Sequence, residues 1–304
     1  MTQFARKLTV SLLIGLFVIV SGAAQSSDPA WLRIQRADKL AADGDYGIAI
    51  QLYREAVTLD PGSPEALFGL ARAFKSVNDY PIAEEYLLEA VAAADDLMVP
   101  AVRYEMNYEL AHLYLVQRRF ADYERVLFQT VALAAGEPVT QRTVDVPADT
   151  LQTVFADNGL DRVLVLYRLE EDGGIRARGE LAELLVGLGR YDEATEQALV
   201  ATTQQLSTVI EAVIERDPGY QYQTVLDALT NAEIYPETRA YLADTSLYHN
   251  LYFFGSALYS GGNSEAARSV WRLLPALPRA GKWSDQAGIQ LADPRPEPLL
   301  VPPR

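Results

Sequence analysis

The sequence contains no cysteine and only two histidines, His112 and His249, among its 304 residues. The lack of cysteine excludes disulfide bonds, thiolate metal ligands and cysteine nucleophiles. It also excludes a lipoprotein anchor, which is attached to a cysteine. Neither histidine belongs to an H-E-x-x-H motif, and no EF-hand loop occurs. We therefore expect no metal, no cofactor and no catalytic residue.

Nucleotide-binding and acyl-transfer motifs are also missing. The chain has no G-x-x-x-x-G-K-[ST] phosphate loop and no G-x-S-x-G nucleophile elbow. Gly187 and Gly189 form half of a dinucleotide-binding fingerprint, but the third glycine is absent. The motif search therefore favours a protein that is not an enzyme.

The chain has fewer basic than acidic residues, with 26 lysines and arginines against 41 aspartates and glutamates, and its formal charge is -15. Nucleic acids and anionic lipid surfaces are polyanions, so this imbalance argues against either as the main partner. Hydrophobic residues make up 49% of the chain, which is enough for a folded core. The acidic excess is typical of a surface that keeps a protein in solution.

One long apolar run occurs, from Leu8 to Val20, after Arg6 and Lys7 and before four small residues that end at Ala24. This order is typical of a secretory signal peptide, here residues 1–24, cleaved after Ala24. The alternative is an uncleaved inner-membrane anchor formed by residues 8–20, but a membrane span needs about 20 apolar residues. No asparagine begins a glycosylation sequon, so we expect a bacterial periplasmic protein.

Small residues recur at a fixed spacing after the signal peptide. Between residues 30 and 63 the recurring residues are Ala37, Tyr46, Ala49, Ala56 and Pro61. From Pro64 onward, Ala71, Tyr80, Ala83 and Ala90 repeat that spacing. These two units resemble tetratricopeptide repeats, which are pairs of antiparallel helices of about 34 residues each. The resemblance implies an all-α fold, a TPR-type solenoid of stacked helical hairpins.

Three further units resemble the same repeat. They begin at Tyr104, Ile175 and Tyr248 and carry Ala111, Tyr114 and Phe120, then Ala182, Gly189, Tyr191, Ala194 and Ala201, then Gly255, Gly262, Ala267 and Trp271. The third unit departs from the pattern at Tyr123 and Thr130, where small residues are expected. The residues expected between the two helices of a unit include Gly44, Asn78, Gly189 and Gly262. Glycine and asparagine tolerate the positive φ of a tight reversal.

The repeats and the signal peptide suggest a division of the chain. We expect a signal peptide at 1–24, three repeats in 25–135, a loop at 136–150, further TPR-like helical pairs in 151–274 with repeats near 175–208 and 248–274, and a disordered tail at 275–304. The tail is predicted from its composition, because it holds seven of the 16 prolines. Proline removes a backbone donor and blocks helix formation.

The resemblance also implies where a partner would bind. In this family one helical stripe on the first helix of each repeat lines the concave face of the solenoid. The candidate partner-binding residues in that groove are Trp31, Phe68, Arg72, Lys75, Tyr108 and His112. Aromatic anchors suit an extended peptide or a partner helix, and Arg72 offers a planar donor fork to a carboxylate. The alternative is that Trp31, Phe68, Tyr108 and His112 pack between helices.

The function predicted from the sequence is an exported, non-catalytic scaffold or adaptor of the cell envelope. Its partner would be another envelope protein or a peptide, with no nucleic acid and no metal. The alternative is a small-molecule-binding or transporter-accessory protein, in which Tyr108, Tyr252 and Tyr259 would line a ligand site.

We predict that the mature protein begins at Gln25, because the small residues before it form the cleavage site. The intact mass of the protein from the periplasmic fraction tests this. A full-length chain fixed in the inner membrane would contradict it.

Overall fold

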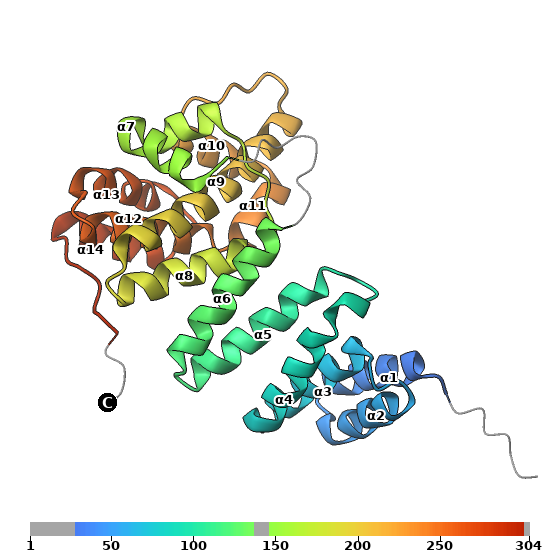
Figure 1. The fold of residues 1–304 in the computed structure, drawn as a ribbon. Coiled ribbons are helices and arrows are strands. Elements are labelled where there is room, and N and C mark those ends of the chain that lie inside the picture. Colours follow the sequence, from blue (N-terminus) through green and yellow to red (C-terminus); the bar gives the residue numbers. More distant parts are fainter. Residues whose placement is uncertain (1–27, 137–145, 301–304) are drawn as a thin grey trace, which may run out of the picture.

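The computed structural model describes residues 28–136 and 146–300, and every regular element in these ranges is helical (Figure 1). The predicted all-α fold of paired, TPR-like helices is therefore confirmed. The predicted signal peptide lies outside the described residues. Within these ranges, no helix combines the length and the apolar character that a membrane crossing requires.

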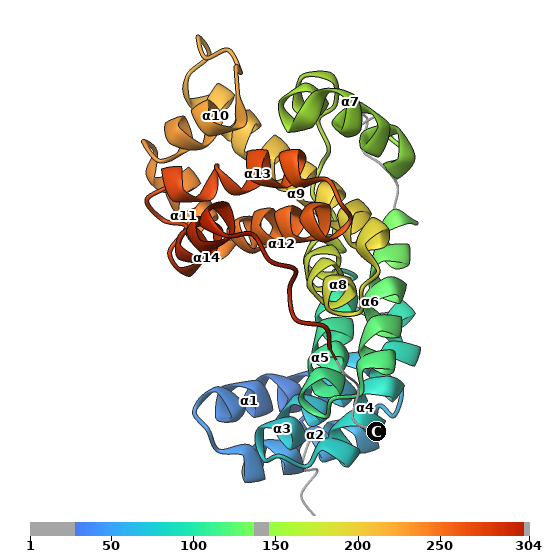
Figure 2. The ribbon, with the colours of Figure 1, turned by 90° about the vertical axis from the view of Figure 1, so that its left-hand side faces the viewer.

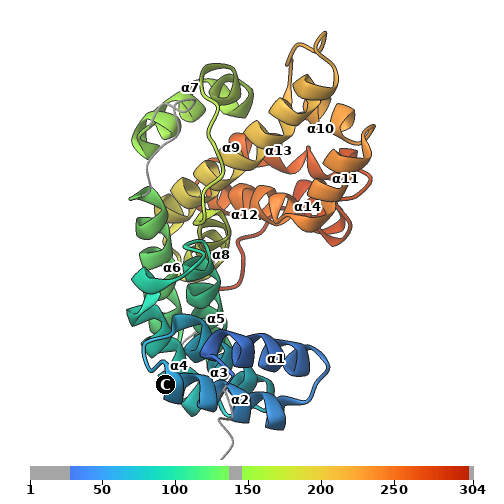
Figure 3. The ribbon, with the colours of Figure 1, turned by 90° about the vertical axis from the view of Figure 1, so that its right-hand side faces the viewer.

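Five helical hairpins form the stack. They are α1 (Ala30–Ala42) with α2 (Tyr46–Leu59), α3 (Pro64–Ser76) with α4 (Tyr80–Ala92), α5 (Val102–Val116) with α6 (Phe120–Ala135), α8 (Ile175–Gly187) with α9 (Tyr191–Arg216), and α12 (Leu247–Ser260) with α13 (Ser264–Trp271). Figures 2 and 3 show that the stack is curved, with α5 and α8 toward its inner side and α6 toward its outer side. We call the side formed by the first helices the inner surface.

The remaining elements are additions to this stack. They are the short 3₁₀ turns η1 (Ala94–Asp96) and η2 (Leu274–Ala276), and the helices α7 (Ala148–Leu166), α10 (Val225–Ala232), α11 (Pro236–Asp244) and α14 (Lys282–Ala292). Helix α7 kinks at Gly159 and packs against α9. It begins inside the loop expected at 136–150, of which residues 137–145 lie outside the described ranges.

The small residues that identify the repeats lie where helices cross. Eleven alanines at these positions have no exposed surface, namely Ala37, Ala49, Ala56, Ala71, Ala83, Ala90, Ala111, Ala182, Ala194, Ala201 and Ala267. In the fifth hairpin, a Cβ on Gly255 would overlap the indole of Trp271. Small side chains therefore allow the helix axes to approach closely, as this kind of packing requires.

The two residues at which the third hairpin departs from the repeat pattern are both buried and hydrogen-bonded. Tyr123 is buried, and its hydroxyl donates to the carboxylate of Glu180 on α8 at 2.8 Å. The Thr130 hydroxyl is buried and donates to the carbonyl of Val126. The third and fourth hairpins thus stack directly, although the chain forms α7 between them.

The predicted turns have the backbone conformation that their residues favour. Gly44, Asn78, Gly189 and Gly262 have φ values of 89°, 62°, 76° and 94°. The corresponding turn of the third hairpin is formed by Arg118, whose φ is 57°. An arginine in this left-handed region is strained, because its Cβ crowds the following carbonyl oxygen.

The disordered tail predicted at 275–304 is wrong for much of its length. Residues 282–292 form α14, which buries Ala287 and Gln290 against the last hairpin. The prolines cluster at 275 and 278 and again from 294 onward, and they leave a proline-free stretch between them. Composition averaged over the whole tail concealed that stretch, in which a helix can form.

We predict that Arg118→Gly stabilises the protein by about 0.5–1 kcal/mol, because glycine adopts positive φ without strain. The Arg118 side chain is exposed, so little contact is lost. Urea denaturation followed by circular dichroism measures the change.

The matched control is Gly44→Ala, which adds a Cβ with no heavy atom within 4 Å but at a φ of 89°. It should destabilise the protein by about 1 kcal/mol. Equal stability for Arg118→Gly and the wild type would show that the third turn is not strained.

Candidate functional site

A row of connected hollows follows the first helices of the first four hairpins. The hollow beside Trp31 shares Asp38 with the next one, and that hollow shares Arg72 with a third. The third shares Arg176 with a fourth, at the start of α12. These neighbouring hollows form a row along the inner surface of four hairpins, which we call the track.

Five of the six predicted site residues meet in one of these hollows, which we call the central hollow. It has a volume of about 300 Å³ and is lined by Phe68, Arg72, Lys75, Glu105, Tyr108, Glu109, His112 and Arg176. The sixth predicted residue, Trp31, lies apart in the hollow at the N-terminal end, with Ile34 and Met98. Helical periodicity therefore placed most of these residues on one surface correctly.

The aromatic residues of the central hollow have structural roles. Phe68 is 6% exposed, and the Arg72 guanidinium lies 5.6 Å from the centre of its ring. The Tyr108 hydroxyl donates to the carbonyl of Gly173 at 2.6 Å and accepts from the amide of Ala177 at 3.2 Å. Burial raises the pKa of Tyr108 to about 12. The packing alternative is therefore correct for Phe68 and for the Tyr108 hydroxyl, while Trp31 is 62% exposed.

The cations of the central hollow differ in their partners. Lys75 forms an ion pair with Glu109 across α3 and α5. Arg176 pairs with Glu180 at 2.7 Å and lies 4.7 Å from the centre of the Tyr108 ring. Arg72 is exposed, and its guanidinium forms no hydrogen bond or salt bridge with the part of the chain that the structure describes. Its donor fork is therefore available to a ligand.

His112 is exposed on the same helix as Tyr108. Partial burial and then the positive charge of Lys75 lower the pKa of His112 below its usual 6.5. The imidazole is therefore neutral near pH 7, and it can accept as well as donate a hydrogen bond.

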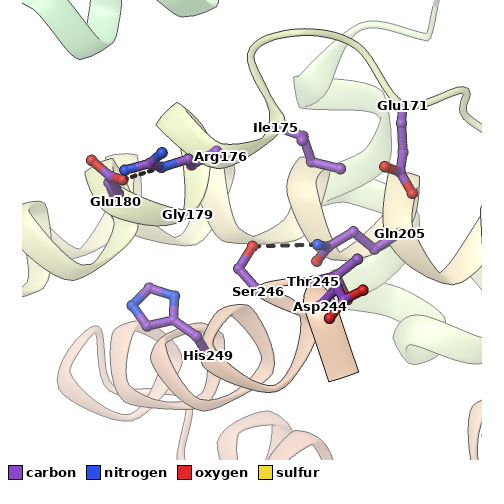
Figure 4. A pocket seen from close by; sticks show the side chains of 10 residues that line it. All are labelled: Glu171, Ile175, Arg176, Gly179, Glu180, Gln205, Asp244, Thr245, Ser246 and His249. Carbon is purple, nitrogen blue, oxygen red and sulfur yellow. Dashed lines mark hydrogen bonds and ion pairs between the residues drawn. The ribbon is translucent and has the colours of Figure 1, made fainter. Parts of the chain in front are cut away.

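The fourth hollow, which we call the junction hollow, lies where α8 meets the start of α12. Its volume is about 590 Å³, and its lining is Glu171, Ile175, Arg176, Gly179, Glu180, Gln205, Asp244, Thr245, Ser246 and His249 (Figure 4). Gln205 donates to the Ser246 hydroxyl at 3.3 Å, and Asn250 donates to Gln205 at 2.8 Å. His249 Nε2 lies 2.9 Å from the Glu183 carboxylate. This hollow has a polar, mixed-charge wall.

The junction hollow was not predicted from the sequence. Two signals for it exist in the sequence. Gly179 occupies a groove position of the fourth repeat, where a Cβ would overlap the amide of Asn250. Helix α9 also carries a run of polar residues that includes Gln204 and Gln205, both buried. Over the described ranges, no group of histidine and acidic side chains could hold a metal ion.

The family comparison agrees with the geometry. Residues 40–103 match the family model of the tetratricopeptide repeat. The chain therefore contains tetratricopeptide repeats. It is similar to an uncharacterized protein of Treponema pallidum (strain Nichols), with 22% identity over 232 residues, which is 75% of this chain and 61% of that protein. The match thus spans less than two thirds of the length of this relative.

Two solved structures are also similar to this chain. One is YrrB, described as a TPR protein with an unusual peptide-binding site, with 16% identity, a TM-score of 0.44 and coverage of 84% of this chain and 90% of YrrB. Another is MamA, with 17% identity, a TM-score of 0.41 and coverage of 90% of this chain and 98% of MamA. These likenesses concern the fold alone.

We predict that Tyr108→Phe destabilises the protein by about 1–2 kcal/mol, because the hydroxyl makes two hydrogen bonds that link α5 to the start of α8. Thermal and urea denaturation measure the change. Tyr80→Phe is the matched control, since its hydroxyl contacts only the exposed Asn78 nearby in sequence. An equal, negligible effect of both substitutions would show that Tyr108 does not hold the third and fourth hairpins together.

Proposed function

We propose that this TPR protein is an exported, non-catalytic scaffold of the cell envelope that binds an extended segment of another protein along its inner surface. The recognised group in the central hollow is a carboxylate, held by Arg72. The envelope location is supported by the order of charge, apolar run and small residues in residues 1–24, which is typical of an export signal.

The observation that carries this proposal is that Arg72 has no acidic partner among the described residues. The chain has a formal charge of -15, yet the central hollow gathers three cations, Arg72, Lys75 and Arg176. Lys75 and Arg176 are each paired with a glutamate, while no acidic side chain among the described residues pairs with Arg72. An arginine fork binds a carboxylate through two parallel hydrogen bonds. A partner's carboxylate would complete the pairing in this hollow.

The rest of the track supplies length and an apolar contact. Arg72 also lines the hollow that leads through Asp38 to the exposed ring of Trp31. Exposed tryptophans bring large contact area at low entropy cost, which makes them effective anchors in interfaces. An extended peptide lying from Trp31 to Arg72 would therefore use one apolar and one charged contact.

The junction hollow supports a second candidate function, the binding of a small polar molecule. Its volume of about 590 Å³ is typical of ligand pockets. Arg176, Glu180 and His249 offer both signs of charge to such a ligand. A thermal-shift screen separates the two functions, because a small-molecule carrier gains stability from the ligand alone.

We predict that Arg72→Glu abolishes binding of the envelope partner while the melting temperature stays within about 1 °C, because Arg72 has no ion pair to lose. Quantitative mass spectrometry of envelope proteins that co-purify with the tagged chain measures the binding. The matched control is Arg162→Glu on α7, an exposed arginine away from the inner surface.

The partner profile of Arg162→Glu should equal that of the wild type. Identical profiles for the wild type, Arg72→Glu and Arg162→Glu, all of them folded, would refute the role of the central hollow.

A further inference from the structure

The chain's own C-terminal segment lies on the inner surface beyond the junction hollow. After α14, residues 293–300, which we call the strap, run in extended form past α12 to the C-terminal end of α8. Figure 2 shows this segment passing along the inner side of the curve. The strap is therefore a peptide seated on the concave face of the last two hairpins.

One side chain holds the middle of the strap. A carboxylate oxygen of Glu297 accepts hydrogen bonds from the Tyr252 hydroxyl at 2.6 Å, the Ser256 hydroxyl at 3.2 Å and the Gln290 amide at 3.4 Å. These three donors are 5%, 2% and 8% exposed. Three neutral, nearly buried donors bond to this one oxygen, and together they form a receptor for a carboxylate.

Backbone contacts fix the strap on both sides of Glu297. The Tyr259 hydroxyl donates to the carbonyl of Pro294 at 3.1 Å, and the amide of Arg295 donates to Gln290 at 2.8 Å. The amide of Leu300 donates to the carbonyl of Gly187 at 2.7 Å. A Cβ on Gly187 would lie 2.8 Å from a side-chain carbon of Leu300, so glycine permits this close approach.

The strap occupies the repeat positions that line a TPR groove. Counted from Tyr248 as the first residue of the fifth repeat, Tyr252, Ser256 and Tyr259 hold the places that Phe68, Arg72 and Lys75 hold in the second repeat. The surface under the strap is therefore equivalent, by repeat position, to the surface of α3 in the central hollow.

The composition of the strap suits a ligand that can be released. Pro294, Pro296 and Pro298 restrict φ and favour an extended chain, so little conformational entropy is lost when the segment is seated. Most of its residues stay exposed, and only Pro294 and Glu297 are half-buried. The strap is thus held at a few points and not built into the core.

We propose that the surface formed by α12, Gln290 and the end of α8 is a second peptide-binding site, specific for an extended segment with a carboxylate side chain between prolines. The strap is its intramolecular occupant and competes with a partner segment of the same chemistry. This site does not include Arg72, so the proposal can be tested independently of the role of the central hollow.

The test uses an N-acetylated, fluorescently labelled peptide with the strap sequence, Asp-Pro-Arg-Pro-Glu-Pro-Leu-Leu. Fluorescence anisotropy titrations compare the wild type with Glu297→Lys, which breaks the central contact and frees the site. The released chain should bind the peptide at least about tenfold more tightly, because a tethered occupant competes at a millimolar effective concentration. A chain that ends at Ala292, with helicity and melting checked, is the second released form.

Two controls test the chemistry of the site. A peptide with glutamine in place of its glutamate should bind the released chain at least about tenfold more weakly, because hydrogen bonds to a charged acceptor are stronger. Tyr252→Phe, introduced into the released chain, should weaken binding of the unmodified peptide in the same way, while Tyr80→Phe should not.

Three results would overturn the proposal. They are the absence of peptide binding by both released chains, equal binding by wild-type and released chains, and equal binding of the glutamate and glutamine peptides. If the released chains melt at a lower temperature and bind no peptide, the strap only stabilises the fold, and this result also overturns the proposal.

Discussion

The close approach of packed helices at small residues is the constraint on which the rest of this structure depends. The eighth position of each repeat, on its first helix, is Ala37, Ala71, Ala111, Ala182 or Gly255, and all five are buried. Because a small residue recurs at this position once per repeat, the hairpins have a similar geometry and can stack in a similar way, which gives a curved stack. A larger residue at this position would push apart the helices that pack there, and the row of hollows along the inner surface would be disturbed.

The solenoid accommodates an inserted helix between its third and fourth hairpins through contacts made by two tyrosines. Helix α7 packs against α9, while the tyrosines of the third hairpin make the junction with α8 in place of an uninterrupted repeat. Tyr108 reaches the backbone at Gly173 and Ala177, and Tyr123 reaches Glu180. The residue that breaks the small-residue pattern at Tyr123 therefore belongs to the interface with α8. A departure from a repeat consensus indicates here where the neighbouring unit makes an additional contact.

The sequence predicted those features that depend on local pattern. Alanine spacing identified the hairpins, and glycine or asparagine identified four of the turns, whereas Arg118 gave no signal because its residue type disfavours positive φ. Periodicity grouped the residues of the central hollow, since a helical stripe is a local property. It did not assign their roles: the Tyr108 hydroxyl is bonded to a carbonyl 65 residues away, a contact that only the tertiary fold creates. The strap was missed for the same reason, because its groove belongs to α8 and α12.

The inner surface presents two different receptors for a carboxylate, and their physical character differs. Arg72 is an exposed charge, so an ion pair made there weakens as salt screens it. Tyr252, Ser256 and Gln290 are neutral and nearly buried, so their hydrogen bonds to Glu297 lie within a region of lower dielectric and are screened much less. The net charge of -15 repels an acidic segment from both receptors at low ionic strength. At Arg72, added salt weakens both the attraction of the ion pair and the repulsion by the net charge, so its two effects oppose each other. At the strap site, the main effect of salt is to weaken the repulsion. High ionic strength therefore favours binding of an acidic segment at the neutral receptor.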